Sequence, residues 1–176
     1  MANVNARSID EIQEFFWVMV NDCSCAAKQW AENDCGYTRR SYVRAVFAFI
    51  EGNTHRMKQL CIQFHESERC VALSKEELEK AAEVKFDEQG NKKIIKIPTL
   101  DNVKLSFSLF SKVFGRINSL DCSGSGWGEL EKALEIRHRL THPKSISYLE
   151  LKSSDMETIE KAVEFYRDTT IAQISV

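Results

Sequence analysis

The sequence contains little of what interrupts regular structure. Only two prolines and seven glycines occur in 176 residues, so long disordered linkers are not expected. No apolar run is long enough to span a bilayer, because FFWVMV at 15–20 is followed at once by Asn21 and Asp22. The N-terminal MANVNARSIDEIQEFF also lacks the basic-then-apolar pattern of a signal peptide. We therefore expect a cytoplasmic protein with no membrane partner.

Neither sign of charge is in large excess, and paired cysteine motifs are missing. The net charge is −2, so a nucleic-acid partner would need a local site rather than a generally basic surface. Cys23-Ser24-Cys25 is not a CxxC pair, and no second ligand pair follows it, which favours ordinary core cysteines over a zinc site. Reduced thiols are expected at Cys23, Cys25, Cys35, Cys61, Cys70 and Cys122.

Apolar residues recur mostly at helical spacing. The capping box Ser8-Ile9-Asp10-Glu11 predicts a helix over 9–32, and a second long helix follows over 38–65. Another capping box, Ser74 to Glu77, opens a short helix that ends near 82. Three further helices are predicted over 100–114 with Gly115 as the stop, from 127 to 141 or 142, and from a cap at 154–157 to 170.

One segment departs from this pattern. Residues 84–97 place apolar residues on either side of Glu88-Gln89-Gly90-Asn91, as expected of a small hairpin with a glycine turn. The sequence therefore predicts a single all-α domain over 1–176. Its architecture would be an up-and-down bundle of four to five long helices, with one β-hairpin inserted at about 84–97.

The stretch EIRHRLTHPKS at 135–145 concentrates titratable and cationic side chains where a helix must stop, since Pro143 cannot continue it. The plainest interpretation is a solvated cationic helix end. A metal site from Glu135, His138 and His142 fits the helical spacing, but the neighbouring arginines would repel a cation. The third interpretation is phosphodiester chemistry. Histidine would move the proton and an arginine fork would stabilise charge on the phosphorus, with no cofactor required.

Residues 137–143, RHRLTHP, resemble the R-polar-x3-H motif of the HEPN superfamily, with His138 at the polar position after Arg137. Residues 39–51, RRSYVRAVFAFIE, are similar to the long early helix of that family, which ends in a glutamate. The resemblance implies an all-α bundle that forms a homodimer, with the two motifs meeting at the interface. Many members are metal-independent endoribonucleases of toxin–antitoxin, abortive-infection or other defence systems.

By this resemblance Arg137 and His142 are the catalytic pair, while His138 and Glu51 support them, Glu51 by orienting the arginine. Arg139, inside the motif, and Lys144, just after it, are expected to contact RNA. The implied reaction cleaves single-stranded RNA, without a cofactor, to 2′,3′-cyclic phosphate and 5′-hydroxyl ends. A possible partner is an antitoxin protein. Lys144 stands where some family toxins carry a tyrosine that is modified, so that form of regulation is not expected.

Two alternatives stay open at the sequence level. Some family members are catalytically silent, so the second hypothesis is a module that binds a partner protein or a nucleotide. The early helix is also locally basic, which indicates either a solvated face or a track for the RNA backbone. The cations concerned are Arg39, Arg40, Arg44, His55, Arg56 and Lys58.

Overall fold

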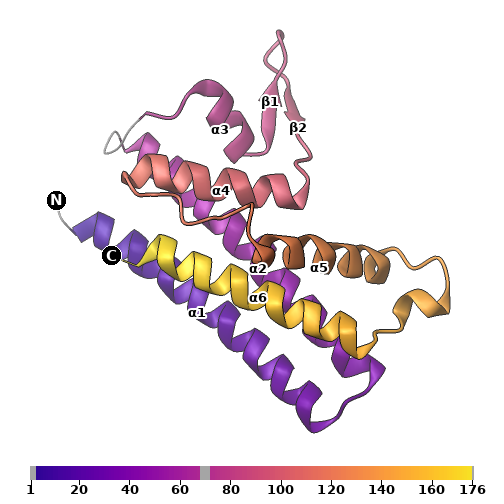
Figure 1. The fold of residues 1–176 in the computed structure, drawn as a ribbon. Coiled ribbons are helices and arrows are strands. Elements are labelled where there is room, and N and C mark those ends of the chain that lie inside the picture. Colours follow the sequence, from indigo (N-terminus) through magenta and orange to yellow (C-terminus); the bar gives the residue numbers. More distant parts are fainter. Residues whose placement is uncertain (1–2, 68–71, 176) are drawn as a thin grey trace. The chain divides into compact units, whose positions relative to one another are not determined.

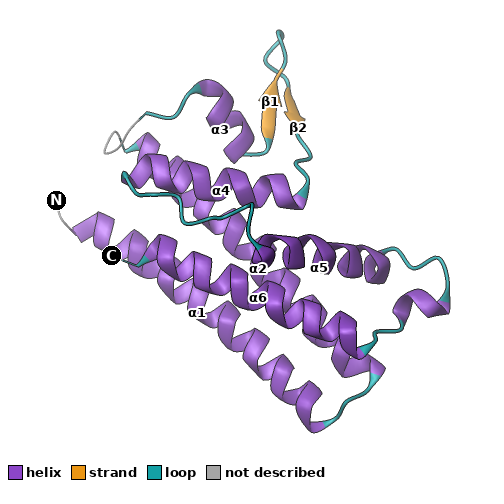
Figure 2. Ribbon diagram, viewed as in Figure 1, coloured by secondary structure: helices purple, strands orange, loops and turns teal. Residues whose placement is uncertain are grey.

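The computed structural model describes residues 3–67 and 72–175, and within these the side chains from residue 10 onward. Helices dominate, and the only strands in the described residues form one small hairpin (Figures 1 and 2). The prediction of an all-α fold with four to five long helices and one β-hairpin is confirmed. The elements are α1 (Asn3–Glu32), α2 (Gly36–Glu66), α3 (Lys75–Ala81), β1 (Val84–Phe86), β2 (Lys92–Ile94), α4 (Thr99–Phe114), α5 (Ser125–Thr141), the 3₁₀ helix η1 (Ile146–Leu149) and α6 (Ser153–Ile174).

Helix ends agree with the sequence where a specific cap is present. Ser74 and Glu77 form the predicted capping box, in which the Glu77 N–H donates to Ser74 Oγ at 3.2 Å and the Ser74 N–H donates to Glu77 Oε2 at 2.7 Å. Gly115 ends α4 with a left-handed φ of 64°, a conformation that glycine adopts at little cost.

Two predicted starts are wrong. Helix α1 already begins at Asn3, so Ser8 lies inside the helix and is not its cap. Helix α6 begins at Ser153, so Ser154 is not its cap either. The N-cap is Lys152, and Asp155 at the third helical position accepts its backbone N–H through Oδ2 at 2.9 Å. A carboxylate is well suited to a helix N-terminus because it meets exposed N–H groups and the positive end of the dipole.

The chain divides into two compact units. The first consists of Gln13–Gly52 with the described residues from Asp121 onward, and it contains parts of α1 and α2 together with α5, η1 and α6. Its core includes edge-to-face rings of Phe16 on Phe49 and of Phe49 on Tyr166. The buried Tyr166 hydroxyl donates to the Ile50 carbonyl at 3.2 Å, so this large side chain is both packed and hydrogen-bonded.

The second unit consists of the described residues up to Ile12 and of Asn53–Leu120, and it contains α3, the hairpin and α4. Phe64 and Phe110 both pack on Phe114, with ring centroids 4.7 and 4.4 Å away. The single-domain organisation stays a prediction.

No disulfide joins the cysteines in the described part of the chain, and Cys70 lies outside it. Burial raises the pKa of Cys23 to about 12, with a smaller contribution from Asp22, which fits a thiol in a core. Within the described ranges no helix has the length and apolar content required to cross a membrane.

Candidate active site at the end of helix α5

Helix α5 presents the motif because its apolar residues face the interior of its own unit. Leu130, Ala133 and Leu140 are buried, whereas His138 and His142 are exposed and Arg137 is half-buried. The helix ends at Thr141, as the following proline requires, and His142 is its C-cap with φ −126° and ψ 62°. The His142 N–H still donates to the His138 carbonyl at 3.0 Å. The backbone at His142 is therefore fixed while its side chain faces solvent.

A cavity of about 800 Å³ lies at this helix end. The two predicted catalytic side chains, Arg137 and His142, both line it, and so do His138, Arg139 and Lys144. The remaining lining residues are Glu135, Ile136, Tyr148 and Asp155. The fold thus brings five of the six predicted site residues to one cavity, three of them from α5 and two, His142 and Lys144, from the segment that follows it.

The sixth residue, Glu51, reaches Arg137 from helix α2. Its Oε1 lies 2.8 Å from the Arg137 Nη2, and the two side chains are 39% and 28% exposed. The Glu51 Oε1 is shielded from solvent, yet no N–H is directed at it well enough to count as a hydrogen bond. We therefore treat the contact as a charge–charge attraction that holds the guanidinium near α2 rather than as an aligned bidentate pair.

Arg137 lies between two hollows of the same unit. Besides the cavity that holds His142, it lines a smaller one of about 390 Å³ with Glu51. The smaller cavity is lined otherwise by α2 and by the last turn of α5, at Val43, Arg44, Phe47, Ala48, Leu140 and Thr141. A ligand in either hollow would meet the same guanidinium.

Arg139 is already engaged by a carboxylate. Its Nη2 lies 2.9 Å from Asp155 Oδ2, the oxygen that also accepts the Lys152 N–H at the start of α6. The contact joins the last turn of α5 to the first turn of α6 and so shapes the cavity wall. Lys144 is exposed, and its ammonium forms no ion pair or hydrogen bond within the described part of the chain.

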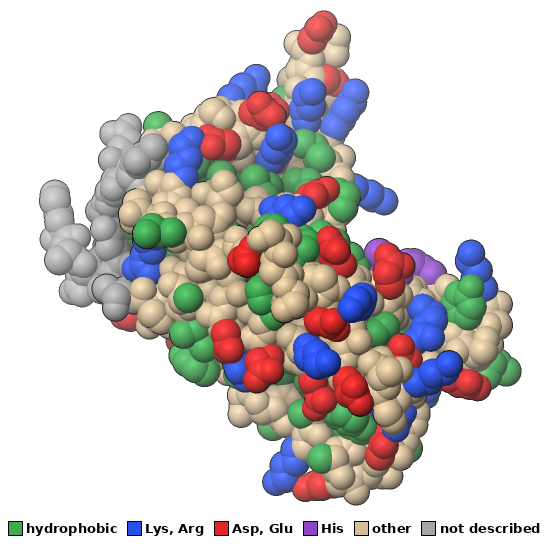
Figure 3. Space-filling model, in the orientation of Figure 1, with side chains coloured by type: hydrophobic (Ala, Val, Ile, Leu, Met, Phe, Trp, Pro, Cys, Tyr) green, Lys and Arg blue, Asp and Glu red, His purple; other side chains and the backbone are tan. Residues whose placement is uncertain are grey.

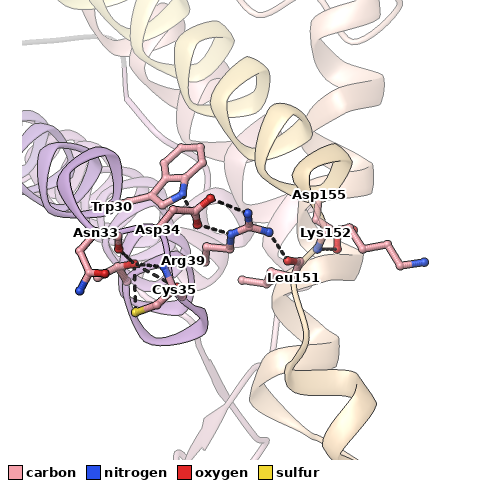
Figure 4. A network of polar contacts seen from close by, with 9 residues as sticks. Trp30, Asn33, Asp34, Cys35, Arg39, Leu151, Lys152 and Asp155 are labelled. Carbon is pink, nitrogen blue, oxygen red and sulfur yellow. Dashed lines mark hydrogen bonds and ion pairs between the residues drawn. The ribbon is translucent and has the colours of Figure 1, made fainter.

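The segment between α5 and α6 is held in place by two arginines from the start of α2. Arg39 donates to both carboxylate oxygens of Asp34 and to the Leu151 carbonyl, as Figure 4 shows. Arg40 donates to the Leu149 carbonyl at 3.2 Å. The hydrogen bond from Arg39 is the main reason that the pKa of Asp34 lies below its ordinary value. These contacts fix the chain that carries Lys144 and Tyr148 past the cavity.

The predicted basic face of the early helix is largely absent. Arg39 and Arg40 point at backbone carbonyls, and Arg56 pairs with Glu11 at 3.1 Å. Lys58 is fully buried, so the expectation of a solvated side chain there is wrong. Only Arg44 and His55 of this group are classed as exposed. A continuous RNA track along this helix is therefore not supported.

Two residues of the cavity could not be found from the sequence. In the sequence, Asp155 belongs only to a predicted helix cap, and Tyr148 belongs to no recognisable motif. Glu135, His138 and His142 do line one cavity, but in the described residues no group of three His, Cys, Asp or Glu side chains is arranged to hold a metal ion. The metal alternative for this stretch is therefore not supported.

Comparison of this chain with protein-family models, with curated proteins and with solved structures finds no match.

Proposed function

We propose that this chain is a HEPN-like, metal-independent endoribonuclease whose active site forms where the motifs of two copies meet. The observation that carries the proposal is the cavity at the end of α5, which gathers Arg137, His138 and His142 beside the exposed Lys144. A fixed cation and a titratable base within one cavity are the minimum that cleavage of RNA through its own 2′-hydroxyl requires.

In the proposed reaction the 2′-oxygen of the ribose attacks the adjacent phosphorus. A bond forms between the 2′-oxygen and phosphorus, and the bond from phosphorus to the 5′-oxygen breaks. The proton lost by the 2′-hydroxyl ends on the leaving 5′-oxygen, and His142 moves it, since imidazole exchanges protons near neutral pH. Arg137 stabilises the charge that builds on the non-bridging oxygens. The products are a 2′,3′-cyclic phosphate and a 5′-hydroxyl.

Glu51 is assigned the role of a positioning residue. Its carboxylate holds one side of the Arg137 guanidinium, which leaves the other nitrogens of the fork to meet a phosphate. His138 shares the cavity and supports the site as a polar neighbour. Lys144 is the outlying cation for the RNA backbone, while Arg139 contributes to RNA binding only with the part of its guanidinium that Asp155 leaves unoccupied.

The wider role proposed for the protein follows from the same resemblance. A cytoplasmic RNase of this kind would act in a toxin–antitoxin or other defence system, as a homodimer on single-stranded RNA, and an antitoxin protein would restrain it. Lys144 replaces the tyrosine that some toxins use as a modification target, so the proposed restraint is binding by the antitoxin rather than modification at that position.

One observation favours a second candidate, a catalytically silent module that binds a partner protein or a nucleotide. Two arginines at the cavity already face carboxylates, Arg137 with Glu51 and Arg139 with Asp155. Neutralised in this way, they attract a phosphate less strongly than free cations would. The two candidates differ in whether Arg137 and His142 are needed for any cleavage.

The test is cleavage of mixed structured and unstructured RNA in EDTA, with the product ends mapped. His142→Ala and Arg137→Ala should each lower the rate by roughly 10²-fold or more, the range for removal of an acid–base group or of a charge stabiliser. Glu51→Gln should lower kcat by about tenfold or more with little change in KM, because it acts through the arginine. Arg167→Ala, on an exposed part of α6, is the matched control and should cleave like the unchanged protein.

Absence of cleavage by the folded protein across these RNAs would contradict the enzyme proposal and favour the binding module. Cleavage that survives both His142→Ala and Arg137→Ala would show that the active site lies elsewhere.

A further inference from the structure

The β-hairpin of the second unit has an unusual charge arrangement. Strands β1 and β2 pair antiparallel, and Lys85 stands directly opposite Lys93. Like charges placed directly across a strand pair repel each other. Asp87 offsets part of this repulsion, since its carboxylate lies 4.0 Å from the Lys93 ammonium. The Lys93 side chain nevertheless stays 71% exposed. This arrangement weakens the hairpin unless an anion occupies the space between the lysines.

The hairpin is also basic as a whole. Between residues 84 and 97 it carries four lysines against two carboxylates, although the complete chain has a net charge of −2. In Figure 3 blue side chains gather over the hairpin, which lies at the top of the view, with acidic side chains towards its tip. The four lysines are all exposed, at Lys85, Lys92, Lys93 and Lys96.

The opposite face of the hairpin combines apolar groups with a cation. Phe86 pairs with Lys92, and Ile94 pairs with Val84, so these four side chains share the face that Lys85 and Lys93 do not. Phe86 is 48% exposed and Ile94 is 81% exposed. An exposed aromatic ring beside an ammonium is the combination that stacks on a nucleobase and holds its phosphate.

The root of the hairpin is fixed by a costly arrangement. Glu83, the residue before β1, has a φ of 55°, a backbone conformation that is rare for residues other than glycine. Its Oε1 accepts from the ammonium of Lys58 at 2.5 Å and from the amide of Asn102 at 3.0 Å, and Lys58 has no exposed surface. Backbone strain of this kind persists only where the surrounding structure enforces it. The buried lysine holds the strained residue and with it the direction of the hairpin.

We propose that this hairpin is an RNA-binding arm, which takes RNA with unpaired bases. Phosphates lie along the face of Lys85 and Lys93 and relieve the repulsion between them, while an unpaired base stacks on Phe86 beside Lys92. The lysines alone would suit an acidic protein or an anionic membrane equally well, whereas RNA with unpaired bases also engages the exposed ring beside Lys92 on the other face. The inference rests on the proposed function in one respect, namely that RNA is the substrate of the chain.

The experiment measures binding and not cleavage, so it stands apart from the test of the active site. Full-length His142→Ala protein is titrated into a fluorescently labelled RNA stem with an unpaired loop, and anisotropy gives Kd over a series of salt concentrations. Adding Lys85→Glu and Lys93→Glu should reduce the slope of log K against log salt by about 1.4, at roughly 0.7 per phosphate contact on single strands. The matched control adds Lys28→Glu and Lys75→Glu, whose side chains are 77% and 85% exposed, and should leave the slope unchanged.

The ring is tested by two substitutions that keep an apolar side chain. Phe86→Leu should weaken binding about fivefold or more, since stacking of one base contributes roughly 1–3 kcal/mol, whereas Phe86→Tyr should retain it. The arm proposal is overturned if the lysine reversal binds RNA with the slope of the control, or if Phe86→Leu binds like the parent. It is also overturned if vesicles of anionic lipid bind as tightly as RNA and through the same lysines. RNA binding through the hairpin by a chain that cleaves no RNA would contradict the proposed enzyme and leave the arm standing.

Discussion

At the scale of single residues, the pair of Lys58 and Glu83 holds a fully buried ammonium against a carboxylate that is only partly exposed. The ammonium of Lys58 also donates to Asn102 Oδ1 at 2.6 Å, so its charge is fully enclosed by polar partners. A buried charge is tolerated only when it is paired in this way. Burial raises the pKa of Glu83, but hydrogen bonds from Lys58 and Asn102 and the charge of Lys58 outweigh it and bring the pKa below its usual 4.5.

Glu83→Gln should therefore destabilise the protein at neutral pH. It leaves the Lys58 ammonium buried with neutral partners only, and the expected loss is about 2–3 kcal/mol of unfolding free energy. This is below the range for a fully enclosed pair because the Glu83 side chain is 36% exposed. Urea denaturation at pH 7 measures it. Glu76→Gln, which breaks the exposed pair with Lys80, should change the unfolding free energy far less, because solvent screens that pair.

The same pair predicts the direction of a pH effect. The folded pKa of Glu83 is lowered, so its contribution to stability is complete above the unfolded value near 4.5 and is lost as pH falls through the folded value. The difference in unfolding free energy between the unchanged protein and Glu83→Gln should shrink when urea denaturation is repeated at about pH 3. A difference that stays constant from pH 7 to pH 3 would show that the ionised carboxylate is not what stabilises this site.

At the scale of elements, helix α5 is placed by close approach to α6. At Gly126 an added Cβ would lie 2.3 Å from Cδ2 of Phe165, a distance that real carbon atoms do not adopt, so this glycine permits the two helices to pack. Two residues further on, Gly128 has no atom within 4 Å of the corresponding position. A side chain at position 126 would therefore clash with α6, whereas position 128 has room for one.

The same substitution at these positions should have opposite effects on stability. Gly126→Ala should destabilise by about 1–3 kcal/mol, because the Phe165 ring or the helix axis must shift. Gly128→Ala should stabilise by about 0.5–1 kcal/mol, because alanine loses less backbone entropy in a helix. Urea denaturation of both variants, with matched circular dichroism, gives the comparison. Effects of equal sign would show that the packing of α5 on α6 at this point is wrong.

Helix interiors were predictable from the sequence, whereas ends and long-range partners were not. Apolar residues at helical spacing identified all five long helices, and Pro143 and Gly115 fixed two ends because their backbone chemistry leaves little choice. The start of α1 was missed because nothing in residues 3–8 breaks a helix. The sequence predicts a basic face that includes Arg39, since no local signal shows that one partner of Arg39 is the Leu151 carbonyl, 112 residues away. The burial of Lys58 is likewise not predictable from the sequence, because its partners Glu83 and Asn102 meet it only in the folded chain.

The site shows the same division between local and long-range information. Arg137, His138 and His142 come from one helix end, so their spacing alone brings them to one cavity. From the sequence, Glu51 could be linked to Arg137 only through the family resemblance. In the structure its Oε1, on α2, lies 2.8 Å from the Arg137 Nη2. Tyr148 lies in η1, and Asp155 lies in the first turn of α6. Neither residue could be assigned to the cavity before the course of the chain between α5 and α6 was known.

At the scale of the whole molecule, the proposed active site belongs to a pair of chains. One copy presents one proposed catalytic pair, Arg137 and His142, at an exposed helix end beside a cavity open to solvent. A two-fold axis through that region would bring two arginines and two histidines into one cleft, because an isologous interface repeats each residue on both sides. The proposal therefore predicts a species of twice the 20.2 kDa chain mass in light scattering.

A shared cleft has a consequence that a self-contained site lacks. In dimers formed from Arg137→Ala chains and His142→Ala chains, one intact arginine and one intact histidine still meet across the axis. Mixing the two variants under conditions that exchange subunits should therefore restore RNA cleavage well above that of either variant alone. Each variant exchanged with itself is the control. If each chain used only its own arginine and histidine, every mixed dimer would lack a complete pair, and mixing would restore nothing.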